Sequence, residues 1–164
     1  MAEIFDVPLE HIEVIQQDTR SGPVAPASGG SQVSYSVINS VRDASFEVRE
    51  RLFDIAKDYF EVAIEDLELH SGNIRVKGVP NKTVTFEKLA KKGETSKNHG
   101  GPIIGKGNSS LPENAPVATV HWVKLRVDPE TGYVTLLKYL VIQDVGFAIN
   151  PMLIEGQMHG GVLQ

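Results

Sequence analysis

A glycine-rich turn, Ser28-Gly29-Gly30-Ser31-Gln32, leads directly into the longest helical pattern of the chain. Glycines allow backbone angles that point successive N–H groups at one spot, and a helix start adds unpaired N–H groups and a positive dipole end. This combination suits a phosphate or another anion. The turn matches neither common nucleotide-binding glycine motif, so from the turn alone a plain loop-to-helix junction with Ser31 as N-cap is the favoured interpretation.

Two other groups of polar residues carry potential binding chemistry. Gln16 and Asp18 follow a short alternating pattern, and their side chains can hydrogen-bond the edge of a polar heterocycle, although a polar turn is the simpler alternative. Further along, Gln143 and Asp144 precede Asn150, which is followed by a proline, a favoured pair at the start of a helix.

The last helical pattern contains Gly156, Gly160 and Gly161 around Gln157. Each glycine inside a helix costs about 1 kcal/mol relative to alanine, so a cluster of them needs a physical reason. Close approach by a cofactor or another backbone is one reason, and tight packing against a neighbouring helix is the other. The residues alone leave both alternatives open.

Several classes of chemistry find no support in the sequence. There is no cysteine among the 164 residues, which excludes disulfides, thiolate zinc sites, iron–sulfur ligation and cysteine nucleophiles within this chain. The 5 histidines have no metal-binding spacing, and no catalytic triad or carboxylate pair stands out. We therefore expect neither a metal ligand nor a catalytic residue.

The composition is that of an ordinary globular domain. Hydrophobic residues make up 41% and charged residues 23%, and the net charge of -5 includes no basic block, so we expect no nucleic-acid partner. No apolar run approaches the roughly 18 residues that a membrane span needs, and there is no signal peptide. These features predict a cytoplasmic protein that does not enter a membrane.

The elements that position these residues alternate between helix and strand patterns. Residues 1–7 are typical of the last turns of a helix, and residues 12–16 alternate as a short strand. Apolar residues at spacings of three and four predict a long amphipathic helix over residues 32–62. Residues 66–92 are predicted as a small β-rich insert, with a hairpin that turns at residues 71–73 and a short helix over residues 86–91. Residues 93–116 are predicted as a long loop with few apolar anchors.

The clearest strand patterns follow this loop. Residues 117–127 and 133–142 are apolar strands joined by a hairpin turn at residues 128–132, and Asn150 then caps a helix. Together the patterns predict an α+β fold in which the long helix packs on a mostly antiparallel sheet. A first helix without a beginning and a last helix without an end further predict a single, partial domain over residues 1–164.

In their order along the chain, these motifs resemble the molybdenum-binding large subunit of the molybdenum hydroxylases, the family of xanthine dehydrogenase, aldehyde oxidoreductase (aldehyde oxidase) and aerobic carbon monoxide dehydrogenase. Each motif alone is modest, but the ordered set is specific and covers essentially the whole chain. The matching segments are residues 7–10, 12–19, 28–31, 39–44, 127–132, 143–146, 149–151 and 155–161.

The resemblance implies that the chain binds molybdopterin. Enzymes of this family hydroxylate a carbon centre, or oxidise carbon monoxide, with oxygen from water at a molybdenum atom held by a pterin dithiolene. In prokaryotic members the pterin usually carries a cytosine dinucleotide. By motif match, the expected cofactor contacts are Gln16, Asp18, Ser28, Gly29, Gly30, Ser31, Gln32, Gln143, Asp144, Asn150 and Gln157.

The resemblance also sets limits. It places the metal-activating glutamate after the last residue of this chain, and the glutamine near the oxo ligand and the substrate pocket before its first. It therefore predicts a cofactor-binding fragment or split subunit that is inactive alone, need not hold the cofactor in isolation, and reveals no substrate. The expected partners are the remaining segments of the molybdenum subunit and FAD-binding and 2Fe-2S subunits, in an oligomer.

Two other classes of function compete with this prediction. A non-catalytic structural or assembly module would keep the fold without the cofactor. A free-standing binder of an unrelated anionic ligand would use only the turn at residues 28–32. The ordered motifs favour the molybdenum subunit.

Overall fold

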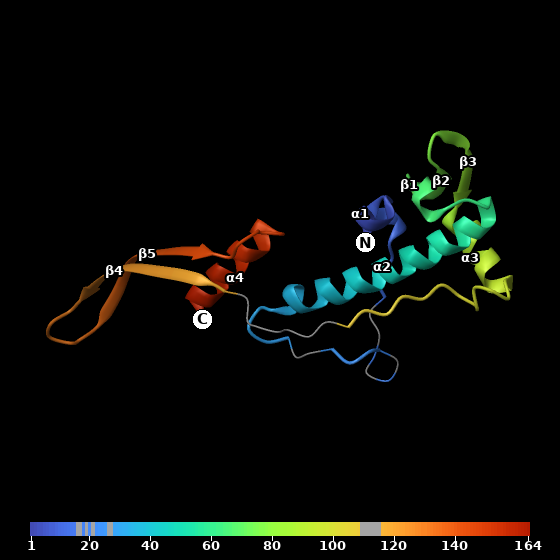
Figure 1. Ribbon diagram of the computed structural model, residues 1–164. Coiled ribbons are helices and arrows are strands. Elements are labelled where there is room, and N and C mark those ends of the chain that lie inside the picture. The colour runs from blue at the N-terminus through green and yellow to red at the C-terminus, as the bar shows by residue number, and fades with distance from the viewer. Residues whose placement is uncertain (16–17, 19, 21, 26–27, 109–115) are drawn as a thin grey trace. The chain divides into compact units, whose positions relative to one another are not determined.

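The computed structural model describes residues 1–15, 18, 20, 22–25, 28–108 and 116–164 (Figure 1). The chain divides into two compact units, Met1–Pro112 and Glu113–Gln164. The first unit contains α1 (Ala2–Phe5), η1 (Leu9–His11), α2 (Val33–Phe60), η2 (Ile64–Asp66), β1 (Leu67–His70), β2 (Asn73–Val76), β3 (Val79–Thr85) and α3 (Phe86–Thr95). The second contains β4 (Ala118–Val127), β5 (Val134–Asp144) and α4 (Pro151–Leu163).

Helix α2 is the main element of the first unit, and its 28 residues confirm the predicted long helix. The side chains of Leu52, Ile55 and Ala56 are buried at the spacing of one helix face, where they meet the small sheet. The helix ends at Glu61, whose φ of 56° is left-handed and whose N–H donates to the carbonyl oxygen of Lys57. This is a common way for a helix to stop.

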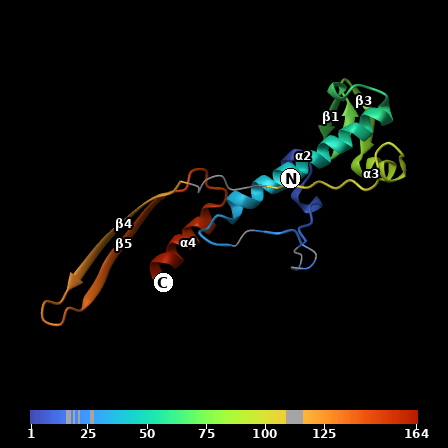
Figure 2. The ribbon, with the colours of Figure 1, turned by 60° about the horizontal axis from the view of Figure 1, so that its bottom comes forward.

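The three-stranded antiparallel sheet has the order β1-β2-β3. Ile74 of β2 lies opposite Leu69 of β1 and Val84 of β3, and it is completely buried. The hydrophobic core thus forms between this sheet, the C-terminal half of α2, and α3. Figures 1 and 2 show that these elements lie side by side. The predicted hairpin within residues 66–92 is confirmed, and so is the α+β fold with a long helix on an antiparallel sheet.

Helix α3 extends further than the sequence predicted. It begins after Thr85, whose hydroxyl oxygen accepts the N–H of Lys88 at 3.2 Å, and it runs to Thr95. The predicted loop over residues 93–116 is therefore wrong for its first three residues. The physical reason is tertiary packing: Leu89 and Gly93 are both buried and one turn apart on this helix, so they hold its last turns in place.

Beyond α3, residues 98–108, which we call the strap, run back alongside α2 without forming a helix or strand (Figure 2). Near its beginning, His99 Nε2 lies 2.9 Å from Asp58 Oδ2. Near its end, the N–H of Lys106 donates to Glu47 Oε2 at 2.7 Å. The part of the predicted loop that the structure describes is thus anchored to α2 by polar contacts. The pattern of apolar residues in the sequence gives no sign of such contacts.

The N-terminal segment agrees only partly with its prediction. Helix α1 is a single turn that buries Phe5, whose ring meets the edge of Phe86 at a centroid distance of 6.0 Å. The short strand predicted over residues 12–16 is wrong for residues 12–15, which have no strand partner in the described chain. Val14 and Ile15 are 84% and 71% exposed, so the alternating pattern has no sheet on which to pack.

The second unit contains the predicted hairpin. Strands β4 and β5 pair antiparallel, with Val120 opposite Ile142, and β5 continues two residues past its predicted end to Asp144. In the turn, the carboxylate of Asp128 accepts the N–H of Glu130 at 2.9 Å, and this bond lowers the pKa of Asp128 below its ordinary value. Gly132 closes the turn with a φ of 72°, as the glycine at this position predicted.

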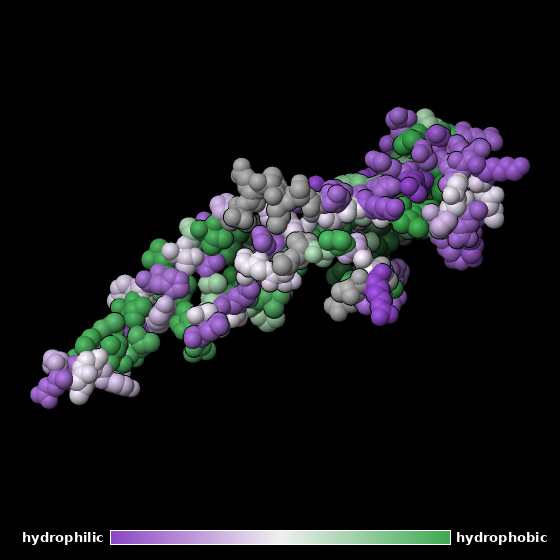
Figure 3. Space-filling model, turned by 90° about the horizontal axis from the view of Figure 1, so that it is seen from below, coloured by the Kyte–Doolittle hydropathy of each residue, from purple (hydrophilic) through white to green (hydrophobic). Residues whose placement is uncertain are grey.

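Large apolar side chains of this hairpin remain exposed, and Figure 3 shows hydrophobic residues along it. Trp122, Leu136 and Ile142 are 49%, 63% and 62% exposed. Helix α4 has no buried residue either. No helix in the described part of the chain is long and apolar enough to span a membrane.

Candidate functional site

The glycine-rich turn has an unusual backbone immediately before α2. Gly30 and Ser31 are consecutive left-handed residues, with φ values of 63° and 56°. A Cβ atom built on Gly29 or Gly30 would meet nothing within 4 Å, so the requirement for glycine at position 30 comes from the backbone angle and not from space. A serine in this region costs roughly 1–2 kcal/mol, and such strain is common at ligand-binding sites.

The junction with α2 differs from the simple capping arrangement. The N-cap residue is Gln32 and not Ser31, and the Gln32 side chain makes no capping hydrogen bond. One turn into the helix, the hydroxyl group of Ser36 donates to the carbonyl oxygens of Gln32 and Val33 at 3.2 and 3.1 Å. The interpretation of this turn as a plain junction capped by Ser31 is therefore wrong about the cap. The turn and the helix start remain a candidate anion site.

The first polar pair is only partly described. Gln16 lies outside the described residues. Asp18 stabilises its own turn, because its Oδ1 atom accepts the N–H of Arg20 at 2.9 Å and its carbonyl oxygen accepts the N–H of Gly22 at 3.0 Å. This is the polar turn that the sequence offered as the simpler alternative, and a contact from Asp18 to a cofactor stays a prediction.

The second unit places three predicted residues around the end of β5 and the start of α4. Gln143 is half-buried and pairs with Thr119 on β4, while Asp144 Oδ1 accepts the N–H of Gly146 at 2.9 Å. Asn150 Oδ1 accepts the N–H of Leu153 at 3.2 Å, which confirms the predicted N-cap. Because the cap uses the side-chain oxygen, a ligand contact from Asn150 would use its NH₂ group.

The glycines of α4 are not explained by packing within the second unit. A Cβ atom built on Gly156, Gly160 or Gly161 would meet nothing within 4 Å. Gln157 lies among them on an exposed part of the helix. Within the second unit α4 is the one helix, so tight packing against a helix elsewhere and close approach by a cofactor or another backbone both stay open.

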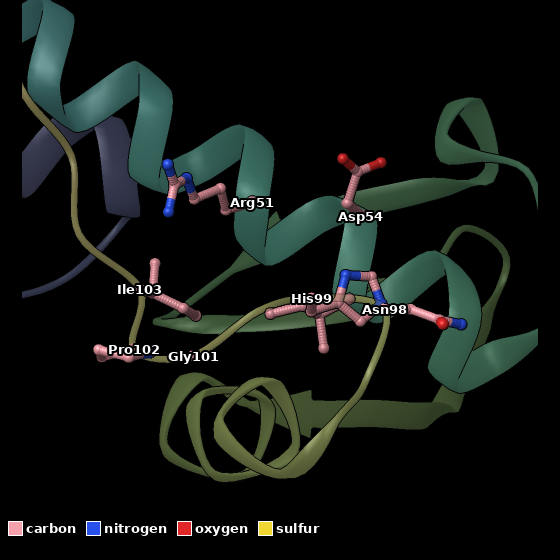
Figure 4. A pocket seen from close by; sticks show the side chains of 8 residues that line it. Arg51, Asp54, Asn98, His99, Gly101, Pro102 and Ile103 are labelled. Carbon is pink, nitrogen blue, oxygen red and sulfur yellow. The ribbon is translucent and has the colours of Figure 1, made fainter.

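Two cavities of the first unit do not coincide with these residues. One, of about 310 Å³, lies between α2 and the strap, where Arg51, Asp54 and His99 are among the lining residues (Figure 4). The other, of about 640 Å³, is an open groove against α1, α2 and β1. None of the predicted cofactor residues lines either cavity. Among the described residues, no group of three or more His, Asp or Glu side chains could hold a metal ion.

Comparison with known proteins defines the family. The molybdopterin cofactor-binding domain family matches residues 1–164, so this chain belongs to that family. The xanthine dehydrogenase molybdenum-binding subunit of Escherichia coli is 29% identical over 164 residues, which cover 99% of this chain and 22% of that subunit. The carbon monoxide dehydrogenase large chain of Afipia carboxidovorans is 27% identical over 169 residues, which cover 100% of this chain and 20% of that protein.

A solved structure gives the same result. Reconstituted CO dehydrogenase from Oligotropha carboxidovorans matches with a TM-score of 0.72 and 26% sequence identity, over 98% of this chain and 20% of that chain. The predicted resemblance to the molybdenum hydroxylase large subunit is confirmed. The chain spans about a fifth of the length of the relatives it matches.

Proposed function

We propose that this chain supplies cofactor contacts within the molybdenum-binding subunit of an oxidoreductase of the xanthine dehydrogenase and carbon monoxide dehydrogenase type. The observation that carries the proposal is the family match over all of residues 1–164. Local geometry supports it, because each unit has a helix start preceded by a left-handed glycine, Gly30 before α2 and Gly146 before α4. When bound, the molybdenum cofactor supplies the redox centre at which a small carbon substrate is oxidised with oxygen from water.

The donor groups of the turn fit an anionic pterin cofactor. The backbone N–H groups of residues 28–32 precede a helix N-terminus, where the helix dipole favours negative charge. We therefore assign the phosphate groups of molybdopterin, in its cytosine dinucleotide form, to Ser28, Gly29, Gly30, Ser31 and Gln32. The open space beside Gly156, Gly160 and Gly161 would let the cofactor approach the backbone of α4.

The amide and carboxylate side chains fit the polar edges of the pterin and the nucleotide. Gln143 and Gln157 can both donate and accept hydrogen bonds, as a pterin edge requires, and the NH₂ group of Asn150 can donate one. Asp18 and Asp144 each accept a backbone N–H in this structure, and a carboxylate can accept further bonds from an amino group of the ligand. We assign these residues to orienting the cofactor and none of them to the chemical step.

We further propose that the chain works in a cytoplasmic oligomer with FAD-binding and 2Fe-2S subunits and with the remaining segments of the molybdenum subunit. The exposed apolar side chains of the β4–β5 hairpin support a covered position in such an assembly, since large exposed apolar patches mark interaction surfaces. Trp122, Leu136 and Leu140 are among them, each at least 47% exposed.

The test uses two substitutions at Asn150 in the complete molybdenum subunit. Asn150→Asp keeps a side-chain oxygen for the helix cap but removes the NH₂ donor, whereas Asn150→Ser keeps a cap without an amide or a charge. We expect both variants to unfold at the wild-type temperature within a few degrees, and both to lose bound pterin, Asn150→Asp more strongly. Pterin fluorescence and molybdenum content per mole of subunit measure the loss.

A substitution in the glycine-rich turn provides the second arm. Gly30→Val places a β-branched residue at a positive φ, so the turn must change its backbone and release the cofactor. Lys82→Ala is the control, because Lys82 is exposed in β3 and lies far along the chain from both the glycine-rich turn and Asn150. This variant should retain full pterin content. A wild-type subunit that binds neither pterin nor molybdenum would contradict the proposal and favour the non-catalytic module.

A further inference from the structure

The N-terminal half of α2, which carries the glycine-rich turn, is held differently from its C-terminal half. Val33, Val37, Ile38 and Val41 are 44%, 40%, 47% and 38% exposed, whereas the buried apolar residues of α2 begin at Leu52. The sheet therefore does not cover the first turns of this helix. Because isolated helices of this length are marginal in water, the N-terminal half needs another source of stability.

The strap lies against this half of α2 at very short range. A Cβ atom built on Gly105 would be 2.1 Å from the carbonyl oxygen of Ala44 and 2.7 Å from a methyl group of Val48. A Cβ atom on Gly107 would be 1.6 Å from the carbonyl oxygen of Ser40. These distances are far inside van der Waals contact, so only glycine at both positions allows the strap to reach the helix.

Ser40 and Ala44 make the matching surface on α2, because they are small residues one helix turn apart. Between the two strap glycines, the N–H of Lys106 donates to Glu47 Oε2 at 2.7 Å. The other oxygen of the same carboxylate, Oε1, accepts from Arg51 at 2.9 Å. The strap is thus fixed by two close backbone approaches and by one charge-assisted hydrogen bond of its main chain.

We propose that Gly105, Gly107 and Glu47 are positioning residues for the cofactor: they dock the strap on α2, keep the N-terminal half of the helix folded, and so hold the turn at residues 28–32 in its binding geometry. The link to the cofactor rests on the proposed function, whereas the docking itself does not. The hydrogen bond comes from the backbone N–H of Lys106, and the charge of the Lys106 side chain makes only the smallest contribution to lowering the pKa of Glu47.

Amide hydrogen exchange of the 164-residue chain tests the docking. In Gly105→Ala and Gly107→Ala, the added methyl group must push the strap off, and we expect amides of residues 33–43 to exchange at least about tenfold faster. Amides of residues 52–60, which the core covers, should change by less than about twofold. Lys106→Ala is the matched control between the glycines and should exchange like wild type. Glu47→Gln is a milder variant that keeps the shape of the acceptor, and it should give an intermediate increase.

Two exchange results would overturn the docking claim. One is wild-type exchange at residues 33–43 in both glycine variants. The other is an equal increase in Lys106→Ala, which would mean that the charge of the strap acts and not its backbone. If a glycine variant fails to fold, Glu47→Gln tests the docking in its place, since that variant adds no atoms to the contact. Faster exchange at residues 33–43 in Glu47→Gln would then support the docking, and wild-type exchange would overturn it.

The cofactor arm uses the complete subunit and measures the half-life of bound molybdopterin during gel filtration. We expect Gly107→Ala to shorten the half-life at least about tenfold relative to Lys106→Ala, and faster exchange without faster pterin loss would overturn the positioning role. A wild-type subunit without pterin would instead contradict the proposed function while leaving the docking result intact. The two failures are therefore distinguishable.

Discussion

Replacement of Leu89 by alanine is the sharpest test of the core that supports α2. Leu89 is completely buried, and together with the partly buried Phe86 it joins α3 to the cluster formed by α2 and the sheet. Removing a fully buried leucine side chain costs about 2–5 kcal/mol, through lost transfer free energy and the cavity left behind. Since α3 has only 10 residues and can shift to fill part of the cavity, we expect a loss of about 3 kcal/mol in the free energy of unfolding.

Urea denaturation followed by far-ultraviolet circular dichroism measures this loss, and amide exchange of residues 67–85 shows whether the sheet opens with it. Leu9→Ala is the matched control, because Leu9 is 77% exposed and its truncation should change stability by less than about 0.5 kcal/mol. A loss below about 1 kcal/mol in Leu89→Ala, or an equal loss in Leu9→Ala, would refute the assignment of the core.

Three further outcomes follow from local contacts. Thr85→Ala removes the N-cap of α3 and should cost about 1 kcal/mol in urea denaturation, whereas Thr85→Ser should stay near wild type. The hydrogen bond from the N–H of Lys106, together with the charge of Arg51, lowers the pKa of Glu47 below its ordinary value of 4.5. The ionised carboxylate therefore stabilises the docked strap at neutral pH. This stabilisation is lost as the pH falls from 4.5 through the lowered pKa. The exchange of the Lys106 amide should therefore accelerate over that range, beyond its intrinsic pH dependence, and Glu47→Gln should abolish this extra change. Gly132→Val puts a β-branched residue at a φ of 72° and should destabilise the β4–β5 hairpin. Faster exchange of the cross-strand amides would measure this effect, whereas unchanged exchange would show that the turn can adopt a different backbone conformation.

Local signals account for the elements that the sequence predicted well. The turn at residues 128–132, the cap at Asn150 and the period of α2 each depend on residues that are close in the chain, so their patterns are visible without a fold. The pattern at residues 12–15 failed for the opposite reason, because a strand needs a partner that the alternation does not specify.

The strap illustrates what the sequence could not show. Gly105 and Gly107 lie in a segment rich in loop-forming residues, and nothing local indicates that Ser40 and Ala44, some 60 residues earlier, are their neighbours. A glycine pair separated by one residue was the only available signal, and many flexible loops contain one.

The candidate site was predicted from motif order and only partly from chemistry. The family match confirms the class of cofactor, but it does not reveal that Asp18, Asp144 and Asn150 already bond to their own backbone. Such local bonds depend on backbone angles that the residue types permit without requiring. They decide which atoms of each side chain remain for a ligand.

The most direct test of the central claim compares amide exchange in the complete molybdenum subunit with and without its cofactor. We predict slower exchange on cofactor binding at residues 28–32 and at residues 150–153, and little change in the three-stranded sheet. Bound cofactor, verified by pterin fluorescence and molybdenum content, with unchanged exchange at both segments would contradict the claim that this chain holds it.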